Sequence, residues 1–309
     1  MVPASPCEHD GVAATTDALL ALLDLERIED DLFRGPSPDT ALQRVFGGQV
    51  LGQALVAAGR TVATDRLVHS LHGYFLRPGD ARVPIVYVVE GIREGRSFST
   101  RRVTARQHGR PIFHMSASFH LAEEGLEHQD VMPDVPDPEG LPHILDGVTI
   151  PPFAWSVPPE RWAALDVRVV APSPDREPPP HPHHPAVAAV WLKITERLPD
   201  DPLVHAAVLA YASDLTLLAS ALVPHGLRLD DPRLQPASLD HAMWFHRPFR
   251  ADEWLLHDEV SPSASGTRGM GLGRVFSSDG RLVATTAQEG LVRFRPEQEQ
   301  PQTRRSRPG

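Results

Sequence analysis

The sequence predicts an α+β protein with an internal duplication, in which two antiparallel sheets each wrap a long buried helix. Three observations lead to this prediction. Two helical segments are apolar on almost every side, which is typical of helices buried inside a fold. Strands follow each of these helices in a group of four, whereas a Rossmann fold or a TIM barrel needs strands that alternate with helices. Short motifs of the first half recur in the second half at a nearly constant spacing.

The composition excludes several classes of protein. Of 309 residues, 41% are hydrophobic, so the chain is too apolar for a disordered protein and long enough for two domains. We expect no transmembrane helix, because no run of about 18 apolar residues occurs. The 40 acidic residues outnumber the 30 basic ones, and the resulting net charge of −10 argues against a nucleic-acid binder. With one cysteine, Cys7, and no secretory signal, we expect a cytoplasmic protein.

The first unit begins with an amphipathic helix over 15–28, where leucines recur at helical spacing behind threonine and aspartate capping residues. A short strand over 31–38 follows. The next helix, 45–62, carries glycines and alanines that permit close packing against a sheet. Runs rich in Val, Ile, Phe and Thr, separated by turns with Gly and Pro, then predict four strands: 67–78, 84–95, 97–109 and 111–122.

The second unit repeats this order of elements. Strands over 167–172 and 189–198 precede a second apolar helix over 203–222. Four more strands are predicted after that helix: 234–249, 253–263, 268–280 and 281–294.

Local motifs support the duplication. FLRP (75–78) matches FHRP (245–248), and QHGRPI (107–112) matches SDGRLV (278–283). The two separations, 170 and 171 residues, agree to within one position. An apolar helix inside its own antiparallel sheet, formed twice, is the physical arrangement that buries both helices.

The predicted domain organisation follows from these elements. The first domain spans 15–122 and the second, which carries the candidate catalytic groups, spans 166–294. Between them, 123–165 is rich in proline and acidic residues, and we expect it to be a stiff, partly extended linker. The polar tail, 295–309, is expected to be disordered.

Asp214 is the sharpest candidate for chemistry. It lies in YASDLTLLASAL (211–222), on a helix with few other polar residues. A buried carboxylate is costly unless it has partners or a shifted pKa, and perturbed carboxylates in clefts are candidates for functional groups. The alternative is a surface aspartate close to a break in the helix.

Gln288 and Ser238 are the other two candidates. Gln288 shares one face of its strand with apolar residues and therefore needs hydrogen-bond partners, which a neighbouring backbone could also supply. The equivalent residue in the first half is Ala117, and the first helix has no acid, so these polar groups occur in one copy only. Ser238, in ASLDH (237–241), fits a nucleophile, an orienting donor or a turn residue, and no GxSxG motif supports a hydrolase nucleophile.

Other polar motifs predict neither a metal nor a cofactor. The HPHHP segment (181–185) has no cysteine or acidic partner at ligand spacing. The chain has no P-loop, and no GxGxxG follows a strand. The histidines on predicted strands fit packed or surface side chains better than bases. They are His69, His72, His241 and His246.

Several motifs together resemble the acyl-CoA thioesterase II family. They are LLDLERIEDDLFRGPSPD, VFGGQVLGQAL, LVHSLHGYFLRPGD, YASDLTLL, LDHAMWFHRPF and TTAQEGLVR, and the resemblance covers roughly 15–294. It implies a double hotdog fold and the hydrolysis of fatty acyl-CoA thioesters to free acid and CoA. It also implies an Asp, a Thr or Ser, and a Gln around one water, at the matched positions Asp214, Ser238 and Gln288. On this reading Asp214 activates the water, Ser238 and Gln288 hold it, and the amides of an unassigned helix N-terminus receive the oxyanion.

Two other functions stay open. One is a hotdog enoyl-CoA hydratase or dehydratase, in which an aspartate would converge with His69 or His241. The other is a non-catalytic acyl-CoA binding protein, since the first half lacks the polar groups of the second.

The expected partner is an acyl-CoA substrate. CoA is polyanionic and the protein is acidic, so a local group of arginines must attract it. The candidates are Arg77, Arg101, Arg102, Arg247 and Arg268. We expect no nucleic acid and no membrane span, and a homo-oligomer, either a dimer or a tetramer of double hotdogs, because the sheets leave edges that can pair.

Overall fold

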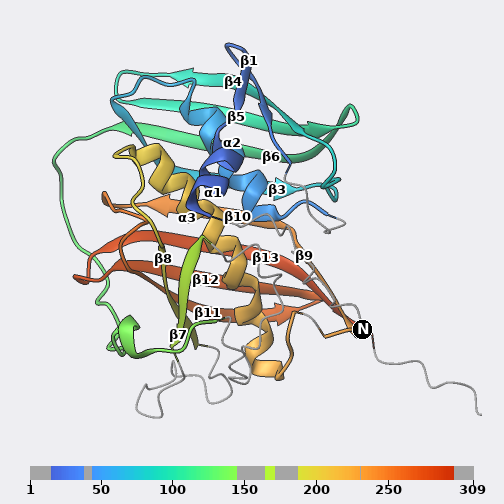
Figure 1. The fold of residues 1–309 in the computed structure, drawn as a ribbon, viewed down its shortest axis with the longest axis vertical. Coiled ribbons are helices and arrows are strands. Elements are labelled where there is room, and N and C mark those ends of the chain that lie inside the picture. The colour runs from blue at the N-terminus through green and yellow to red at the C-terminus, as the bar shows by residue number, and fades with distance from the viewer. Residues whose placement is uncertain (1–14, 38–43, 145–163, 171–186, 230, 296–309) are drawn as a thin grey trace, which may run out of the picture.

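The fold is built on one continuous antiparallel sheet. The computed structural model describes residues 15–37, 44–144, 164–170, 187–229 and 231–295. Cys7, the HPHHP segment and the tail from residue 296 onward lie outside these residues. Thirteen strands form the sheet in the order β1-β2-β4-β5-β6-β3-β10-β13-β12-β11-β8-β7, and β9 pairs with β13. Figure 1 shows the strands of the first half, in blue to green, above those of the second half, in yellow-green to red.

In the described part of the first half, the chain forms two helices and six strands. Helix α1 spans Thr16–Leu23 and is capped by the Thr15 hydroxyl, which accepts from Ala18 N at 3.2 Å. The helix is shorter than the predicted 15–28, and the chain continues in extended form, with a strand over 26–29. Helix α2 spans Gly47–Gly59. The strands are β1 (Glu26–Glu29), β2 (Leu32–Gly35), β3 (Arg66–Phe75), β4 (Ile85–Glu94), β5 (Phe98–Gln107) and β6 (Arg110–Leu121).

The second half repeats this arrangement in reverse order across the sheet. Helix α3 spans Pro202–Thr216 and continues as a 3-10 helix, η3, over Leu217–His225. A 3-10 turn, η1 (Pro138–Gly140), lies in the segment between the halves. The strands are β7 (Leu165–Val170), β8 (Val187–Ile194), β9 (Leu234–Ser238), β10 (Asp240–Phe245), β11 (Leu255–Ser265), β12 (Arg268–Ser277) and β13 (Leu282–Phe294).

The two predicted sheets are joined in the structure. Strands β3 and β10 pair in the middle, and Ala242 lies opposite His72. These two residues are 170 positions apart, the same spacing as the repeated motifs, so a pseudo-two-fold axis passes between them. The pairing satisfies backbone groups on two edges that separate sheets would expose.

Two glycines of α2 contact the other long helix, in addition to the packing of α2 against the sheet that the sequence suggests. A Cβ atom on Gly48 would lie 2.4 Å from the carbonyl oxygen of Tyr211, and one on Gly52 would lie 3.0 Å from that of Ala207. The glycines therefore let α2 and α3 approach backbone to backbone. One buried apolar cluster spans both halves around these helices.

The second apolar helix is not one regular α-helix. It tightens to 3-10 geometry after Thr216, and Gly226, with φ of 61°, ends it. Pro202–His225 is long and apolar enough to cross a membrane by length and composition, with a mean hydropathy of 1.7, but 83% of its most apolar window is buried in the fold. It is a core helix.

The beginning of the predicted linker packs along the second half. Trp191 donates its indole N–H to the carbonyl of Pro136 at 3.0 Å, and the side chains of Met132 and Leu141 cover the same small apolar cluster. The predicted strand over 234–249 is divided, because β9 ends at Ser238 and β10 begins at Asp240.

Candidate active site

Asp214, Ser238 and Gln288 meet although up to 74 residues separate them in the chain. Asp214 lies in the last turn of α3, Ser238 ends β9, and Gln288 lies on β13. The Gln288 amide donates to Asp214 Oδ1 at 2.5 Å and to Ser238 Oγ at 3.1 Å. The Ser238 hydroxyl donates to the same Asp214 oxygen at 3.3 Å. Two donor side chains, one from β9 and one from β13, thus converge on one oxygen of the carboxylate that α3 carries.

The local strand register brings two of these side chains together. Ser238 pairs with Gly290 on β13, two residues beyond Gln288. Opposite Gln288 on β12 stands Gly271, where a Cβ atom would lie 2.6 Å from the carbonyl oxygen of Leu217. The missing side chain lets the start of η3 approach the sheet. The Asp214 side chain is 3% exposed and Gln288 is fully buried.

His241 lies beside this cluster. Its ring is fully buried, with Nδ1 3.8 Å from Asp214 Oδ1 and Nε2 3.0 Å from the Ser213 hydroxyl. Burial, reinforced by the nearby His257 ring, lowers the pKa of His241 to about 3. The imidazole is therefore neutral at physiological pH. From the sequence, His241 is one of four strand histidines and, with His69, a candidate only for the hydratase alternative.

Asp214 and Ser238 open onto an apolar cleft of about 480 Å³. The cleft lies between the start of α2, the junction of α3 with η3, and strands of both halves. Its apolar walls are formed by Val45, Phe46, Val50, Phe75, Ile112, Phe113, Leu215, Leu218 and Leu229. Such a cleft fits a long apolar ligand with a polar group near Asp214.

The N-terminus of α2 points to the same carboxylate. A Cβ atom on Gly47 would lie 2.6 Å from Asp214 Oδ2 and 3.1 Å from the Phe75 ring. The N-cap residue, Phe46, makes no side-chain capping bond within the part of the chain that the structure describes. The Phe46 side chain thus gives the first-turn amides of α2 no N-cap bond at the cleft, and a helix N-terminus favours negative charge.

Comparison with known proteins identifies the family. The sequence profile of the acyl-CoA thioesterase N-terminal domain matches residues 35–120, and that of acyl-CoA thioesterase matches residues 177–291. Acyl-CoA thioesterase 2 of Haemophilus influenzae is 43% identical over 279 residues, which cover 89% of this chain and 97% of that protein. The chain belongs to the acyl-CoA thioesterase family. Human acyl-coenzyme A thioesterase 8 is 41% identical, with 89% of each chain covered.

Solved structures agree with the architecture of this acyl-CoA thioesterase. A crystal structure of acyl-CoA thioesterase II from Mycobacterium marinum is 48% identical, covers 89% of this chain and 98% of its own, and superposes with a TM-score of 0.76. A hot dog fold protein from Alicyclobacillus acidocaldarius is 22% identical, covers 90% of this chain and 99% of its own, and has a TM-score of 0.71, which shows the fold alone. The predicted double hotdog fold is confirmed.

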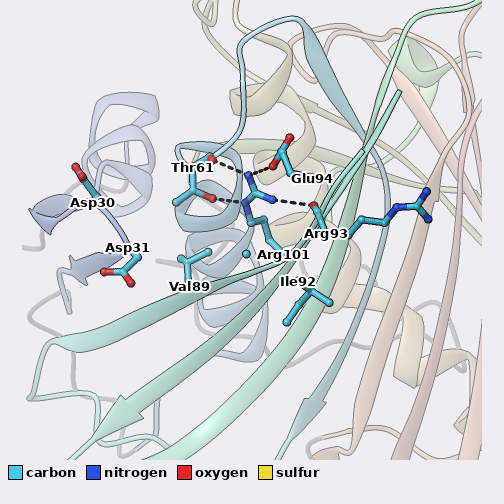
Figure 2. Close-up of a pocket in the computed structure, with 9 residues that line it drawn as sticks. Asp30, Asp31, Thr61, Val89, Ile92, Arg93, Glu94 and Arg101 are labelled. Carbon is cyan, nitrogen blue, oxygen red and sulfur yellow. Dashed lines mark hydrogen bonds and ion pairs between the residues drawn. The ribbon is translucent and has the colours of Figure 1, made fainter. Parts of the chain in front are cut away.

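In the first half of the thioesterase, different side chains occupy the positions that correspond to the Asp214, Ser238 and Gln288 cluster. Ala117 stands where the second half has Gln288, and its neighbour on β5 is Arg101, where the second half has Gly271. The Arg101 guanidinium donates to the Thr61 hydroxyl at 2.9 Å and to Glu94 at 2.6 Å (Figure 2). These residues line a separate pocket of about 350 Å³. Arg101 is buried in a structural network, which makes it unsuitable as a CoA ligand.

The other arginines expected to attract CoA differ in position. Among the residues that the structure describes, Arg77 is the only one of the five candidates that lines the cleft, and Arg44, which sequence reasoning missed, lines it too. Arg102 pairs with Glu90 and Arg268 with Glu289. Arg247 donates to the carbonyl of Leu282 at 2.9 Å.

The remaining strand histidines make local contacts. His69 Nε2 lies 2.8 Å from the Ser118 hydroxyl, and His246 Nε2 lies 2.8 Å from that of Thr285. The His72 ring packs edge-on against Trp244. In the part of the thioesterase that the structure describes, none of these three histidines lines the cleft.

Proposed function

We propose that this enzyme hydrolyses acyl-CoA thioesters with a water that Asp214 activates and that Ser238 and Gln288 hold. Asp214 takes a proton as the water oxygen bonds to the thioester carbon. The carbon–sulfur bond then breaks, and that proton goes to the departing CoA thiolate. The products are a free fatty acid and CoA, without a covalent acyl-enzyme. The observation that carries the proposal is the convergence of both donors on one Asp214 oxygen at the wall of an apolar cleft.

The oxyanion would be received by the first-turn amides of α2. Gly47 and Gly48 begin this helix, and the lack of a side chain on Gly47 leaves room beside Asp214 Oδ2. Backbone amides in this position are preorganised donors, and the helix dipole adds positive potential at the same end. No motif in the sequence identifies these amides.

The acyl chain and the CoA part of the substrate would bind to different parts of the cleft. The apolar side chains accept the acyl chain, and Arg44 and Arg77 are the cationic groups that line the cleft and could meet the phosphates of CoA. This pair replaces the wider set of arginines expected from the sequence.

The hydratase alternative lacks its histidine. In hydratase chemistry an imidazole must reach the substrate, but His241 is fully buried with a pKa lowered to about 3, and His69 contacts Ser118. Within the described part of the chain, neither histidine lines the cleft. Gln288 does not line it either, but its amide donates to Asp214 and Ser238, which do. A non-catalytic acyl-CoA binding protein would differ from a hydrolase in the assay below, because it would release no thiol from acyl-CoA.

The test is thiol release from acyl-CoA substrates of several chain lengths. We expect Asp214→Asn to lower kcat by about 100-fold or more, since a positioned general base contributes this much. The control is Asp30→Asn, whose side chain is fully exposed. An Asp214→Asn enzyme with full activity would overturn the mechanism, and turnover of enoyl-CoA without thiol release would favour the hydratase.

We also propose that the chain forms a homo-oligomer, a dimer or a tetramer. The sheet ends at β1 and β7, and strands at an edge carry backbone groups that can pair. Light scattering after gel filtration tests this, and a monomer would refute it. A cytoplasmic location and a role in fatty acid metabolism stay predictions from the sequence.

A further inference from the structure

A second buried polar network lies next to the site and takes no part in the proposed chemistry. The Thr216 hydroxyl donates to the Glu259 carboxylate. Glu259 Oε1 lies 2.9 Å from His257 Nδ1, and His257 Nε2 lies 2.9 Å from the Thr286 hydroxyl. Each of these four residues is at most 1% exposed. In the described part of the chain, none of them lines the cleft.

The network connects the two elements that carry Asp214 and Gln288. Thr216 ends α3, two residues after Asp214, at the point where the helix changes to 3-10 geometry. Thr286 lies on β13 two residues before Gln288, so both side chains are on the inward face of the strand. Glu259 and His257 span the space between these two ends.

The sheet is shaped to hold the histidine. Gly273 lies opposite Glu259 on β12, and a Cβ atom there would be only 2.3 Å from His257 Nε2. An imidazole and a carboxylate are costly to bury, and apolar side chains of similar size often stabilise a fold as well or better. Stability alone therefore does not account for this network.

The first half shows that the same sheet folds with apolar residues. In the second half Glu259 pairs with Gly273, which pairs with Thr286. The corresponding row, 170 or 171 residues earlier, is Val89, Val103 and Met115, and all three are buried. The polar row is confined to the half that carries Asp214.

We propose that Thr216, Glu259, His257 and Thr286 are positioning residues of the active site. The Glu259–His257 pair holds the Thr216 hydroxyl and so sets the direction in which the last turn of α3 presents Asp214. Through Thr286 the same pair also holds β13, the strand that carries Gln288, and in this way it fixes the distance between Asp214 and Gln288. This inference rests on the proposed roles of Asp214 and Gln288.

The test compares two substitutions at one position. Thr216→Val removes the hydroxyl at nearly constant volume, whereas Thr216→Ser keeps it. We expect Thr216→Val to lower kcat by about 10- to 100-fold with KM within about twofold, as for a misplaced catalytic group, and Thr216→Ser to restore most of the rate. The matched control is Thr61→Val, which removes a hydrogen-bonded hydroxyl from the first half and should leave kcat unchanged.

Wild-type kcat in Thr216→Val, or equal losses in the Val and Ser variants, would overturn the positioning role. If Thr216→Val does not fold, a combined variant replaces the polar network by apolar side chains. It gives the second half the row of the first half through Glu259→Val, Gly273→Val and Thr286→Met, and it also carries His257→Phe. We expect it to fold with kcat lowered at least as much, and wild-type kcat in this protein would also overturn the inference. Asp214→Asn separates the two failures: if it is active the proposed mechanism fails, and if it is inactive while Thr216→Val is normal only the positioning role fails.

Discussion

Substitution of Gly47 by alanine tests the close approach between α2 and Asp214, the proposed catalytic carboxylate. The new methyl carbon would lie 2.6 Å from Asp214 Oδ2 and 3.1 Å from two atoms of the Phe75 ring. Gly47 is the first residue of α2 and its φ is not in the left-handed region, so alanine fits its backbone. The perturbation is thus confined to the space beside Asp214.

The size of the effect follows from this contact. Ordinary contact starts near 3.4 Å, so the carboxylate and the methyl group must separate by about 0.8 Å. A misplacement of about 1 Å in an active site costs up to about 100-fold in rate, and we expect kcat/KM to fall by about 10- to 100-fold. Stability should change little, because alanine fits the backbone at this position and the new contact is limited to the Asp214 carboxylate and the Phe75 ring.

The assay is thiol release under initial-rate conditions, together with thermal unfolding of the same samples. Gly91→Ala is the control, because a Cβ atom there meets nothing within 4 Å. Gly47→Ala with kcat/KM within twofold of the wild type would refute the placement of α2 against Asp214. A loss of activity that follows a large loss of stability would refute the argument that the effect is local.

Three further changes have defined outcomes. Ser238→Thr keeps the hydroxyl and should retain thiol release within about threefold, whereas Ser238→Ala should lose about 10- to 100-fold; equal rates in the two would contradict the role of the hydroxyl. Phe113→Ala opens the buried wall of the cleft and should shift kcat/KM toward longer acyl chains at a cost of about 3–5 kcal/mol in stability, and an unchanged chain-length ratio would contradict this. Burial lowers the pKa of His241 to about 3, so below pH 6.5 the unfolded chain binds a proton that the folded protein does not. The free energy of unfolding should therefore fall by about 1.4 kcal/mol per pH unit from pH 6.5 toward 3, relative to His241→Asn. The measurement is urea unfolding at a series of pH values, and the same pH dependence of the unfolding free energy in both proteins would contradict the prediction.

Strands were predictable because alternation and turn residues are local signals. The strand predicted over 97–109 is β5, Phe98–Gln107, and it ends where His108 and Gly109 adopt positive φ angles of 49° and 71°. The joining of β3 to β10 was not predictable. It rests on backbone hydrogen bonds between the two strands, and these leave no pattern in the side chains.

The candidate site was predictable only where a polar side chain breaks an apolar pattern. Asp214 and Gln288 stand out on apolar elements, but Ser238 was identified through the motif around it, since a serine at the end of a strand resembles an ordinary turn residue. His257 and Glu259 lie on a strand whose sequence reads like a half-exposed one, and their burial depends on Gly273 of the neighbouring strand. The Gly47 amide carries no side-chain signal at all.

The pseudo-symmetry explains why the duplicated chain has one candidate site rather than two. Each site would combine the start of one helix with the end of the other, so Gly47 of the first half serves Asp214 of the second. The symmetric combination is blocked, because Leu203 fills the space beside Gly59, with its Cδ atoms 2.5 Å from where a Cβ would stand. In addition, the first two residues of α3 offer no free amide to a ligand. Pro202 has no N–H, and the Asp201 side chain accepts from the amide of Leu203. Under the proposed mechanism, the first half therefore contributes the start of α2 and part of the apolar wall to the one candidate site.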